Sequence, residues 1–125
     1  MIAARRETAG YYRAALGDLP GISFMPVAGY GLPNWWLTCL LVDADRFGAS
    51  RDRILSTLRA RNIEARPTWK PMHLQPVFRD ASMRGGDVCA DLFRRGLCLP
   101  SGSALTQQDR ERVVEAVRAA TEQGA

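Results

Sequence analysis

One short segment, residues 66–78, restricts the fold of this chain more than any other part of its sequence. It contains three prolines together with the chain's one lysine, its one histidine and two aromatic residues. Each proline removes a backbone donor and fixes φ, so the segment can form neither the interior of a helix nor a central strand. We therefore predict a stiff loop. Loops that bring arginine, lysine, histidine and tryptophan together often carry binding or catalytic groups.

The rest of the sequence predicts a single domain over residues 1–125. Helical periodicity and capping signals predict helices over residues 4–19, 50–62, 87–95 and 105–118. Short apolar runs predict strands over residues 21–25, 34–42, 63–65 and 97–99. The second of these strands is apolar on both faces, so we place it in the centre of the sheet. We expect an α+β fold in which helices cover one face of a small antiparallel sheet.

Two features at the ends of these helices are predicted in more detail. The third helix is expected to turn Val88, Leu92 and Phe93 inward, and Gly96 is expected to cap it in the left-handed conformation. The last helix begins with a threonine followed three residues later by an aspartate, the spacing of a capping box. The last four residues of the chain are expected to fray.

The charge pattern argues against a nucleic-acid partner. The net charge is +4 and almost all of the positive charge is arginine, but acidic residues interrupt the arginines throughout, as in residues 109–112. We interpret these arginines as solvated helix faces, which leaves a nucleic-acid or phosphate partner as an alternative that charge alone suggests. No apolar run approaches the roughly 18 residues of a membrane span. The start of the chain lacks an apolar signal segment, so we expect a cytoplasmic protein.

The three cysteines, Cys39, Cys89 and Cys98, are odd in number and widely spaced. Each lies among apolar residues, so we expect buried thiols that act as small apolar side chains. A zinc site needs about four ligands at close spacing, and one isolated histidine does not supply them. The sequence therefore predicts reduced cysteines and no metal site.

The polar residues of the proline-rich segment each allow two interpretations. Lys70 suits a Schiff-base amine or a phosphate contact, and equally a solvated charge. Arg66 suits a bidentate anion contact or an ordinary surface position. Trp69 suits stacking on a ring or covering the edge of the core, and His73 a ligand contact or a link within the loop. The glycine-rich segment at 29–31 is too short for a phosphate loop. These residues alone support an anion-binding or sugar-phosphate-binding loop.

Two segments, residues 63–76 (IEARPTWKPMHLQP) and 96–102 (GLCLPSG), resemble the C-terminal part of a known enzyme family. This is the DegT/DnrJ/EryC1/StrS group of pyridoxal-phosphate-dependent sugar aminotransferases. Residues 34–38, the first helix and the capped last helix are similar in kind and order, so the resemblance covers essentially the whole chain.

The resemblance implies the small C-terminal domain of the aspartate-aminotransferase type fold (PLP fold type I). Complete members are homodimers that move an amino group, usually from glutamate, onto a keto group of a nucleotide-linked sugar, for example in polysaccharide biosynthesis. Their pyridoxal phosphate is held by a lysine of a large domain, and Lys70 does not match that lysine. We therefore expect no catalytic residue, no bound cofactor and no transaminase activity in this chain alone, and a large domain supplied in cis or in trans.

By motif position, the resemblance also assigns contacts with the nucleotide-sugar. These would be polar contacts from Arg66, Lys70 and His73 and packing by Trp69, with Asn34 and Trp36 as weaker candidates. The alternatives are a non-catalytic module that binds a nucleotide-sugar or a protein, and an unrelated enzyme that uses Lys70 as its amine. A domain built to pack on a larger one should expose aromatic residues and self-associate when isolated. We expect this of Tyr30, Trp35, Trp36 and Phe78.

Overall fold

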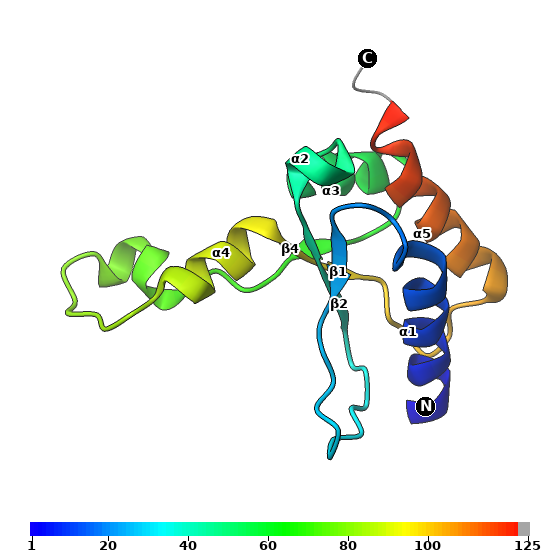
Figure 1. Ribbon diagram of the computed structural model, residues 1–125, viewed down its shortest axis with the longest axis horizontal. Helices are drawn as coiled ribbons and strands as arrows, with labels where there is room; N and C mark the ends of the chain where they lie inside the picture. The colour runs from blue at the N-terminus through cyan, green and yellow to red at the C-terminus, as the bar shows by residue number, and fades with distance from the viewer. Residues whose placement is uncertain (123–125) are drawn as a thin grey trace.

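A computed structural model describes residues 1–122 and contains one four-stranded antiparallel sheet, which confirms the predicted α+β class (Figure 1). In order across the sheet, the strands are β1 (Ile22–Phe24), β2 (Thr38–Val42), β4 (Gly96–Leu99) and β3 (Arg66–Pro67). The antiparallel pairing of β1 with β2 is as predicted, and β2 occupies a central position. The expected fraying falls mainly on residues 123–125, which lie outside the described residues.

Three helices, α1 (Ile2–Leu16), α3 (Arg51–Ala60) and α5 (Gln107–Ala119), cover one face of the sheet and enclose the core. Their buried side chains have the predicted helical spacing and meet the alternate residues of the central strands. The helices contribute Tyr12, Leu16, Ile54, Leu58, Val113 and Val117 to the core, and the central strands contribute Leu40, Val42, Leu97 and Leu99. The other face of the sheet is not covered by these three helices, and there Cys39 and Leu41 are half-buried.

The predicted caps at the starts of α3 and α5 are confirmed. Ser50 accepts a hydrogen bond from the Arg53 amide at 3.2 Å, and Thr106 and Asp109 form a reciprocal capping box at the start of α5. A further short helix, α2 (Ala44–Phe47), was not predicted because four residues are too few to show a helical period.

An arm, residues 68–95, projects from the sheet on the side opposite α1 and α5 (Figure 1). It contains two 3₁₀ turns, η1 (Met72–Leu74) and η2 (Pro76–Phe78), followed by helix α4 (Asp87–Arg95). The bounds of α4 are as predicted, but the predicted inward face is wrong. Val88 is 72% exposed and Leu92 42% exposed, and Phe93 is only half-buried. The apolar face of α4 turns toward the open side of the sheet instead of the core.

Two predicted strand boundaries and one cap are also wrong. The second strand begins at Thr38, not at residue 34, and residues 63–65 form no strand. The third strand is Arg66–Pro67, at the edge of the sheet, where a proline costs no ladder hydrogen bond on its outer side. Gly96 is an extended residue of β4 with φ −91°, not a left-handed cap. Glycine fits at residue 96 because a side chain there would overlap Leu92 and Thr68, and not because the backbone is left-handed.

Candidate functional site

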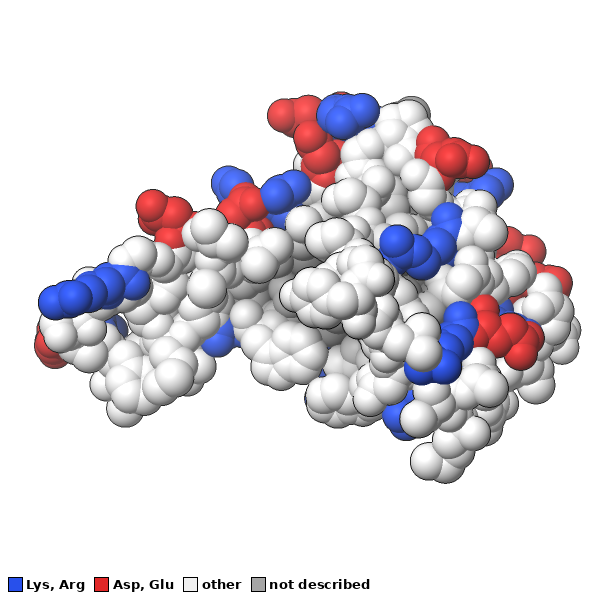
Figure 2. All heavy atoms as spheres, turned by 60° about the horizontal axis from the view of Figure 1, so that its bottom comes forward, with Lys and Arg blue, Asp and Glu red and all other residues white. Residues whose placement is uncertain are grey.

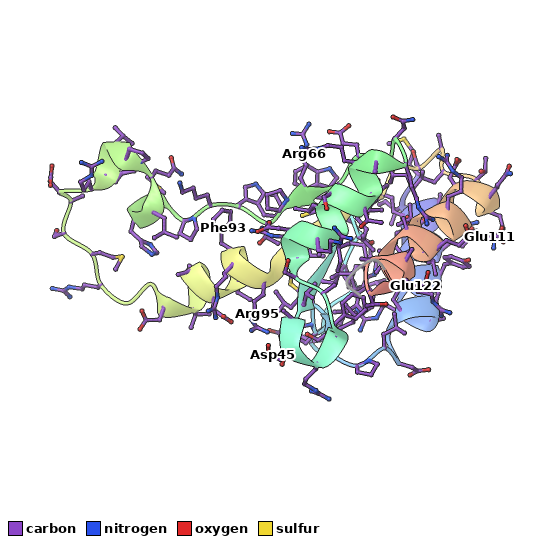
Figure 3. All side chains as sticks on the ribbon, turned by 90° about the horizontal axis from the view of Figure 1, so that it is seen from above. Asp45, Arg66, Phe93, Arg95, Glu111 and Glu122 are labelled. Atoms are coloured by element: carbon purple, nitrogen blue, oxygen red, sulfur yellow. The ribbon has the colours of Figure 1, made fainter. Side chains whose placement is uncertain are left out.

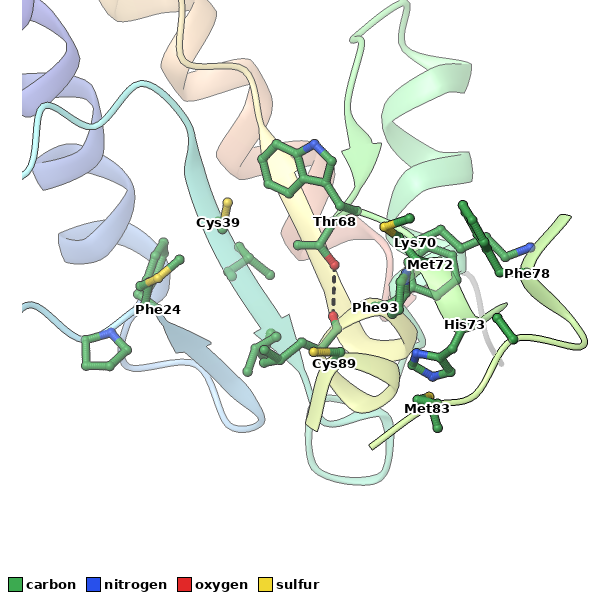
Figure 4. A pocket seen from close by; sticks show the side chains of 18 of the residues that line it. Phe24, Cys39, Thr68, Lys70, Met72, His73, Phe78, Met83, Cys89 and Phe93 are labelled. Carbon is green, nitrogen blue, oxygen red and sulfur yellow. Dashed lines mark hydrogen bonds between the residues drawn. The ribbon is translucent and has the colours of Figure 1, made fainter. Parts of the chain in front are cut away.

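The open face of the sheet and the arm together enclose a cavity of about 850 Å³. Cys39 and Leu41 face it from β2, since they alternate with the core residues Leu40 and Val42. Figure 4 shows Phe24 on one side, Cys39 on the strand, and His73, Phe78 and Met83 on the side of the arm. Among residues 1–122, Lys70 and His73 are the only lining residues, apart from cysteines, with an ionisable side chain. The cavity is therefore an apolar groove with a few polar groups, the usual composition of a ligand site.

A second cavity of about 520 Å³ adjoins the first. Residues 31–37 line it, and four residues line both cavities: Met25, Pro26, Cys39 and Trp69. In the space-filling view, the surface between the arm and the body is hollowed and mostly uncharged, and most charged side chains lie outside it (Figure 2). The two cavities form one continuous apolar face, with Trp69 and Cys39 where they meet.

The base of the arm is fixed to the sheet by hydrogen bonds from two residues. The Thr68 amide donates to the Gly96 carbonyl at 3.1 Å, and its hydroxyl donates to the Leu92 carbonyl at 2.9 Å. Arg51, at the start of α3, donates to the Phe93 and Gly96 carbonyls and lies over the Phe93 ring at 5.5 Å. These contacts hold the start of the loop and the end of α4 side by side. The larger cavity is thus preformed at this end.

The predicted site residues separate into three groups. Trp69, Lys70 and His73 line the larger cavity, while Asn34, Trp36 and Trp69 line the smaller one. Arg66 lines neither cavity. It points outward (Figure 3) and forms an exposed ion pair with Glu64 at 2.6 Å. The structure therefore brings five of the six residues to one face, and their contacts with a sugar remain predictions.

The wall of the smaller cavity contains an unusual backbone turn. Trp35 has a φ of 52°, in the left-handed region that bulky residues rarely adopt. The Asn34 side-chain oxygen accepts the Trp36 amide at 3.0 Å, and the Arg13 guanidinium lies 5.2 Å from the Trp35 ring. Asn34 therefore shapes this turn, whatever else it contacts. Backbone outliers of this kind are concentrated at functional sites.

Of the four aromatic residues predicted to be uncovered, two are exposed. Tyr30 is 99% exposed and Trp36 60% exposed, whereas Trp35 and Phe78 are half-buried. Self-association of the isolated chain remains a prediction.

The cysteines are not uniformly buried, contrary to prediction. Cys98 is buried, Cys39 is half-buried and Cys89 is exposed on the arm. The sulfur atoms of Cys39 and Cys98 lie 3.5 Å apart. A hydrogen bond from the Cys98 thiol lowers the pKa of Cys39 to about 7 although partial burial opposes this, and the same bond raises the pKa of Cys98. Sequence reasoning missed this pair because it depends on the register between two distant strands.

We expect Cys39 to be alkylated by iodoacetamide with a pH midpoint near 7. About half of Cys39 would then be thiolate at neutral pH, whereas an ordinary thiol, with a pKa of ~8.5, is only a few per cent ionised. Cys98→Ala removes the hydrogen bond and should move the midpoint upward to the ordinary thiol value of ~8.5 or above it, because partial burial of Cys39 then acts unopposed. Peptide mass spectrometry across pH 5–9 follows each cysteine separately. An unchanged midpoint in the variant would exclude Cys98 as the cause.

Among residues 1–122, no group of three histidine, cysteine or acidic side chains is placed to hold a metal ion. Over the same range, none of the helices has the length and apolar content of a membrane span.

The comparison with protein families decides the identity of this fold. The model of the DegT/DnrJ/EryC1/StrS aminotransferase family matches residues 1–118. The chain belongs to this family. EpsN of Bacillus subtilis (strain 168), named as a pyridoxal phosphate-dependent aminotransferase, is 47% identical over 115 residues, which cover 89% of this chain and 29% of EpsN. A dTDP-4-amino-4,6-dideoxy-D-glucose transaminase of Shigella dysenteriae is 32% identical over 113 residues, 86% of this chain and 30% of that protein.

Solved structures agree with the family assignment. DesI, crystallised in the presence of its TDP-sugar product, matches 99% of this chain with a TM-score of 0.86 and 28% identity. DesV of S. venezuelae, in complex with a ketimine intermediate, matches 98% with a TM-score of 0.81 and 29% identity. The chain covers 32% of each of these structures. This family member therefore spans about 30% of the length of the relatives that it matches.

The family is pyridoxal-phosphate-dependent, so the lining of the two cavities can be compared with what that cofactor requires. A pyridoxal phosphate site needs a lysine for the Schiff base and an acidic or arginine partner for the pyridine nitrogen. Neither an acidic residue nor an arginine lines either cavity in the described part of the chain. The residues of this chain that line the two cavities do not fit the complete cofactor site.

Proposed function

We propose that this chain is the C-terminal small domain of a pyridoxal-phosphate-dependent enzyme that moves an amino group from glutamate to a keto group of a nucleotide-linked sugar. The observation that carries the proposal is the open apolar face, which combines Trp69, Lys70 and His73 in a chain of this family. In this proposal a large domain, in cis or in trans, packs beside this face and completes the substrate site. The complete enzyme would be a homodimer, as the family resemblance implies.

The residues of the arm would bind and orient the sugar nucleotide. Lys70 would place a positive charge near phosphate, and His73 would donate a hydrogen bond beside it. Trp69, 65% exposed where the two cavities meet, offers a flat apolar surface for a sugar or base ring. The Gln75 side-chain amide donates to the Lys70 carbonyl at 3.3 Å, which holds the loop between these residues in shape.

The large domain would hold pyridoxal phosphate, which would supply the amino-transfer chemistry, while the residues of this chain would hold the sugar nucleotide. The apolar lining of the larger cavity would exclude water from the surface between the domains, which strengthens charged contacts made there. In this division of labour, the small domain determines affinity for the sugar nucleotide and the large domain carries the chemistry. The chain alone is then expected to be inactive and to bind no cofactor.

We expect Lys70→Ala or His73→Ala in the complete enzyme to raise KM for the sugar nucleotide by about ten- to a hundredfold, with a smaller effect on kcat. Losing one hydrogen bond to a charged group costs ~1.5–3 kcal/mol, and 1.4 kcal/mol is tenfold. Arg79→Ala is the matched control, since this exposed arginine of the arm lines neither cavity. Amino transfer from glutamate to the keto-sugar, followed by steady-state kinetics, provides the measurement.

Arg66→Ala tests the sixth predicted contact in the same assay. A raised KM would mean that the ion pair with Glu64 opens to admit substrate, and an unchanged KM would remove Arg66 from the site. If the complete protein transfers no amino group while the chain binds the sugar nucleotide in calorimetry, the non-catalytic binding module replaces the enzyme proposal.

A further inference from the structure

Cys39 and Cys98 lie directly opposite each other on the two central strands. The register of β2 and β4 pairs them, between the pairs Thr38–Leu99 and Leu40–Leu97. They belong to the open face of the sheet, because their neighbours Leu40, Leu97 and Leu99 are buried in the core. Their sulfur atoms are 3.5 Å apart, although 59 residues separate them in the sequence.

The hydrogen bonding of β4 shows what kind of cross-strand pair this is. The Gly96 carbonyl accepts the Thr68 amide on the β3 side of the strand. Polar backbone groups of a strand alternate in direction, so those of Cys98 also point toward β3 and away from Cys39. Cys39 and Cys98 are therefore a non-hydrogen-bonded pair, in which Cα atoms lie about 4.5 Å apart and side chains approach most closely.

This geometry falls within the range that a disulfide requires. Bridged cysteines have Cα atoms about 4.4–6.8 Å apart and an S–S bond of about 2.05 Å. The two sulfur atoms must approach by about 1.5 Å, which small side-chain rotations on neighbouring strands can provide. By contrast, Cys89 lies on the arm and has neither cysteine as a cross-strand partner.

We propose that Cys39 and Cys98 are an oxidation site, which a hydroperoxide converts into a cross-strand disulfide at the floor of the two cavities. Cys39 is the residue that the oxidant reaches, because it is half-buried and lines both cavities, whereas Cys98 is buried behind it. This inference is independent of the proposed function, since it depends only on the two thiols and their access.

The reaction has two steps with a hydroperoxide as oxidant. The Cys39 thiolate attacks the terminal peroxide oxygen and the O–O bond breaks, which gives a Cys39 sulfenic acid and a hydroxide or alkoxide. The hydroxide or alkoxide takes up the proton that Cys39 released to solvent on ionising and leaves as water or an alcohol. The Cys98 sulfur then attacks the Cys39 sulfur, the S–O bond breaks, and a second water leaves with the thiol proton. Two thiols lose two electrons and two protons in total, and the peroxide is reduced by two electrons. The lowered pKa of Cys39 favours the first step and the adjacent Cys98 favours the second.

The test uses the full chain, reduced and then treated with one equivalent of hydrogen peroxide at neutral pH. We expect a monomer about 2 Da lighter, with a single peptide cross-link between Cys39 and Cys98 and Cys89 still free to alkylation. Cys89→Ser is the matched control, and it should form the same cross-link with the same yield. In Cys98→Ser, Cys39 should stop at the sulfenic acid, which dimedone traps.

The proposal is overturned if Cys89 is oxidised before the pair, if the cross-link joins Cys89 to Cys39, or if peroxide leaves Cys39 reduced. Because these outcomes are read in the unsubstituted chain and in Cys89→Ser, the test does not depend on whether Cys98→Ser folds.

Discussion

Gly96→Ala should lower the free energy of unfolding by about 3 kcal/mol, within the upper range for an overpacked core position. A Cβ atom at residue 96 would lie 2.4 Å from the Leu92 carbonyl oxygen and 2.5 Å from the Thr68 hydroxyl oxygen. Both atoms belong to the contacts that hold the arm on the sheet, and Gly96 itself is buried in β4. Relieving the overlap would therefore break the Thr68–Leu92 hydrogen bond and displace the end of α4. Urea unfolding followed by tryptophan fluorescence measures the loss.

Gly10→Ala is the matched control for this substitution. Gly10 is exposed within α1, and nothing lies within 4 Å of an added Cβ atom. Alanine should therefore stabilise the helix by about 0.5–1 kcal/mol, because it restricts the unfolded chain and is the better helix former. Equal unfolding midpoints for the two variants would contradict the close approach of Leu92 and Thr68 to Gly96.

Local chemistry explains which parts of the fold could be predicted from the sequence. The caps at Ser50 and Thr106 and the buried spacing of α1, α3 and α5 depend on residues within a few positions of one another. The apolar face of α4 has the same periodicity, so the sequence could not distinguish a helix that packs on the core from one that lines an open groove. That distinction depends on where the arm leaves the sheet.

The candidate site was predictable for the same local reason and only in part. Trp69, Lys70 and His73 occur together between prolines, and this stiff loop places all three on the larger cavity. The pairing of Cys39 with Cys98 depends on the register of β2 with β4, and no short-range signal fixes a register between strands so distant in sequence. Arg66 was expected beside the lysine and histidine, but it belongs to edge strand β3 and points outward to Glu64.

Leu97→Ala should lower the free energy of unfolding by about 2–5 kcal/mol, the range for truncating a fully buried leucine. Leu97 has no exposed surface, lies in the central strand β4 and faces Leu40 across the sheet within the core. The substitution removes apolar contacts and leaves a cavity between the sheet and the helices that cannot fully collapse. Thermal and urea unfolding of the two proteins side by side gives the difference.

Leu92→Ala makes the same chemical change five positions earlier in the chain, in helix α4, which lies beside the open face of the sheet. Leu92 is 42% exposed and lines the larger cavity from α4, so its truncation should cost less than about 1 kcal/mol in the isolated chain. If a large domain packs on this face, the same variant should weaken that association, because the leucine becomes buried only in the complex. A loss of stability equal to that of Leu97→Ala would mean that α4 belongs to the core and that the groove is closed in solution. A small loss of stability together with weaker association would identify the open face of the sheet as the surface that completes the enzyme.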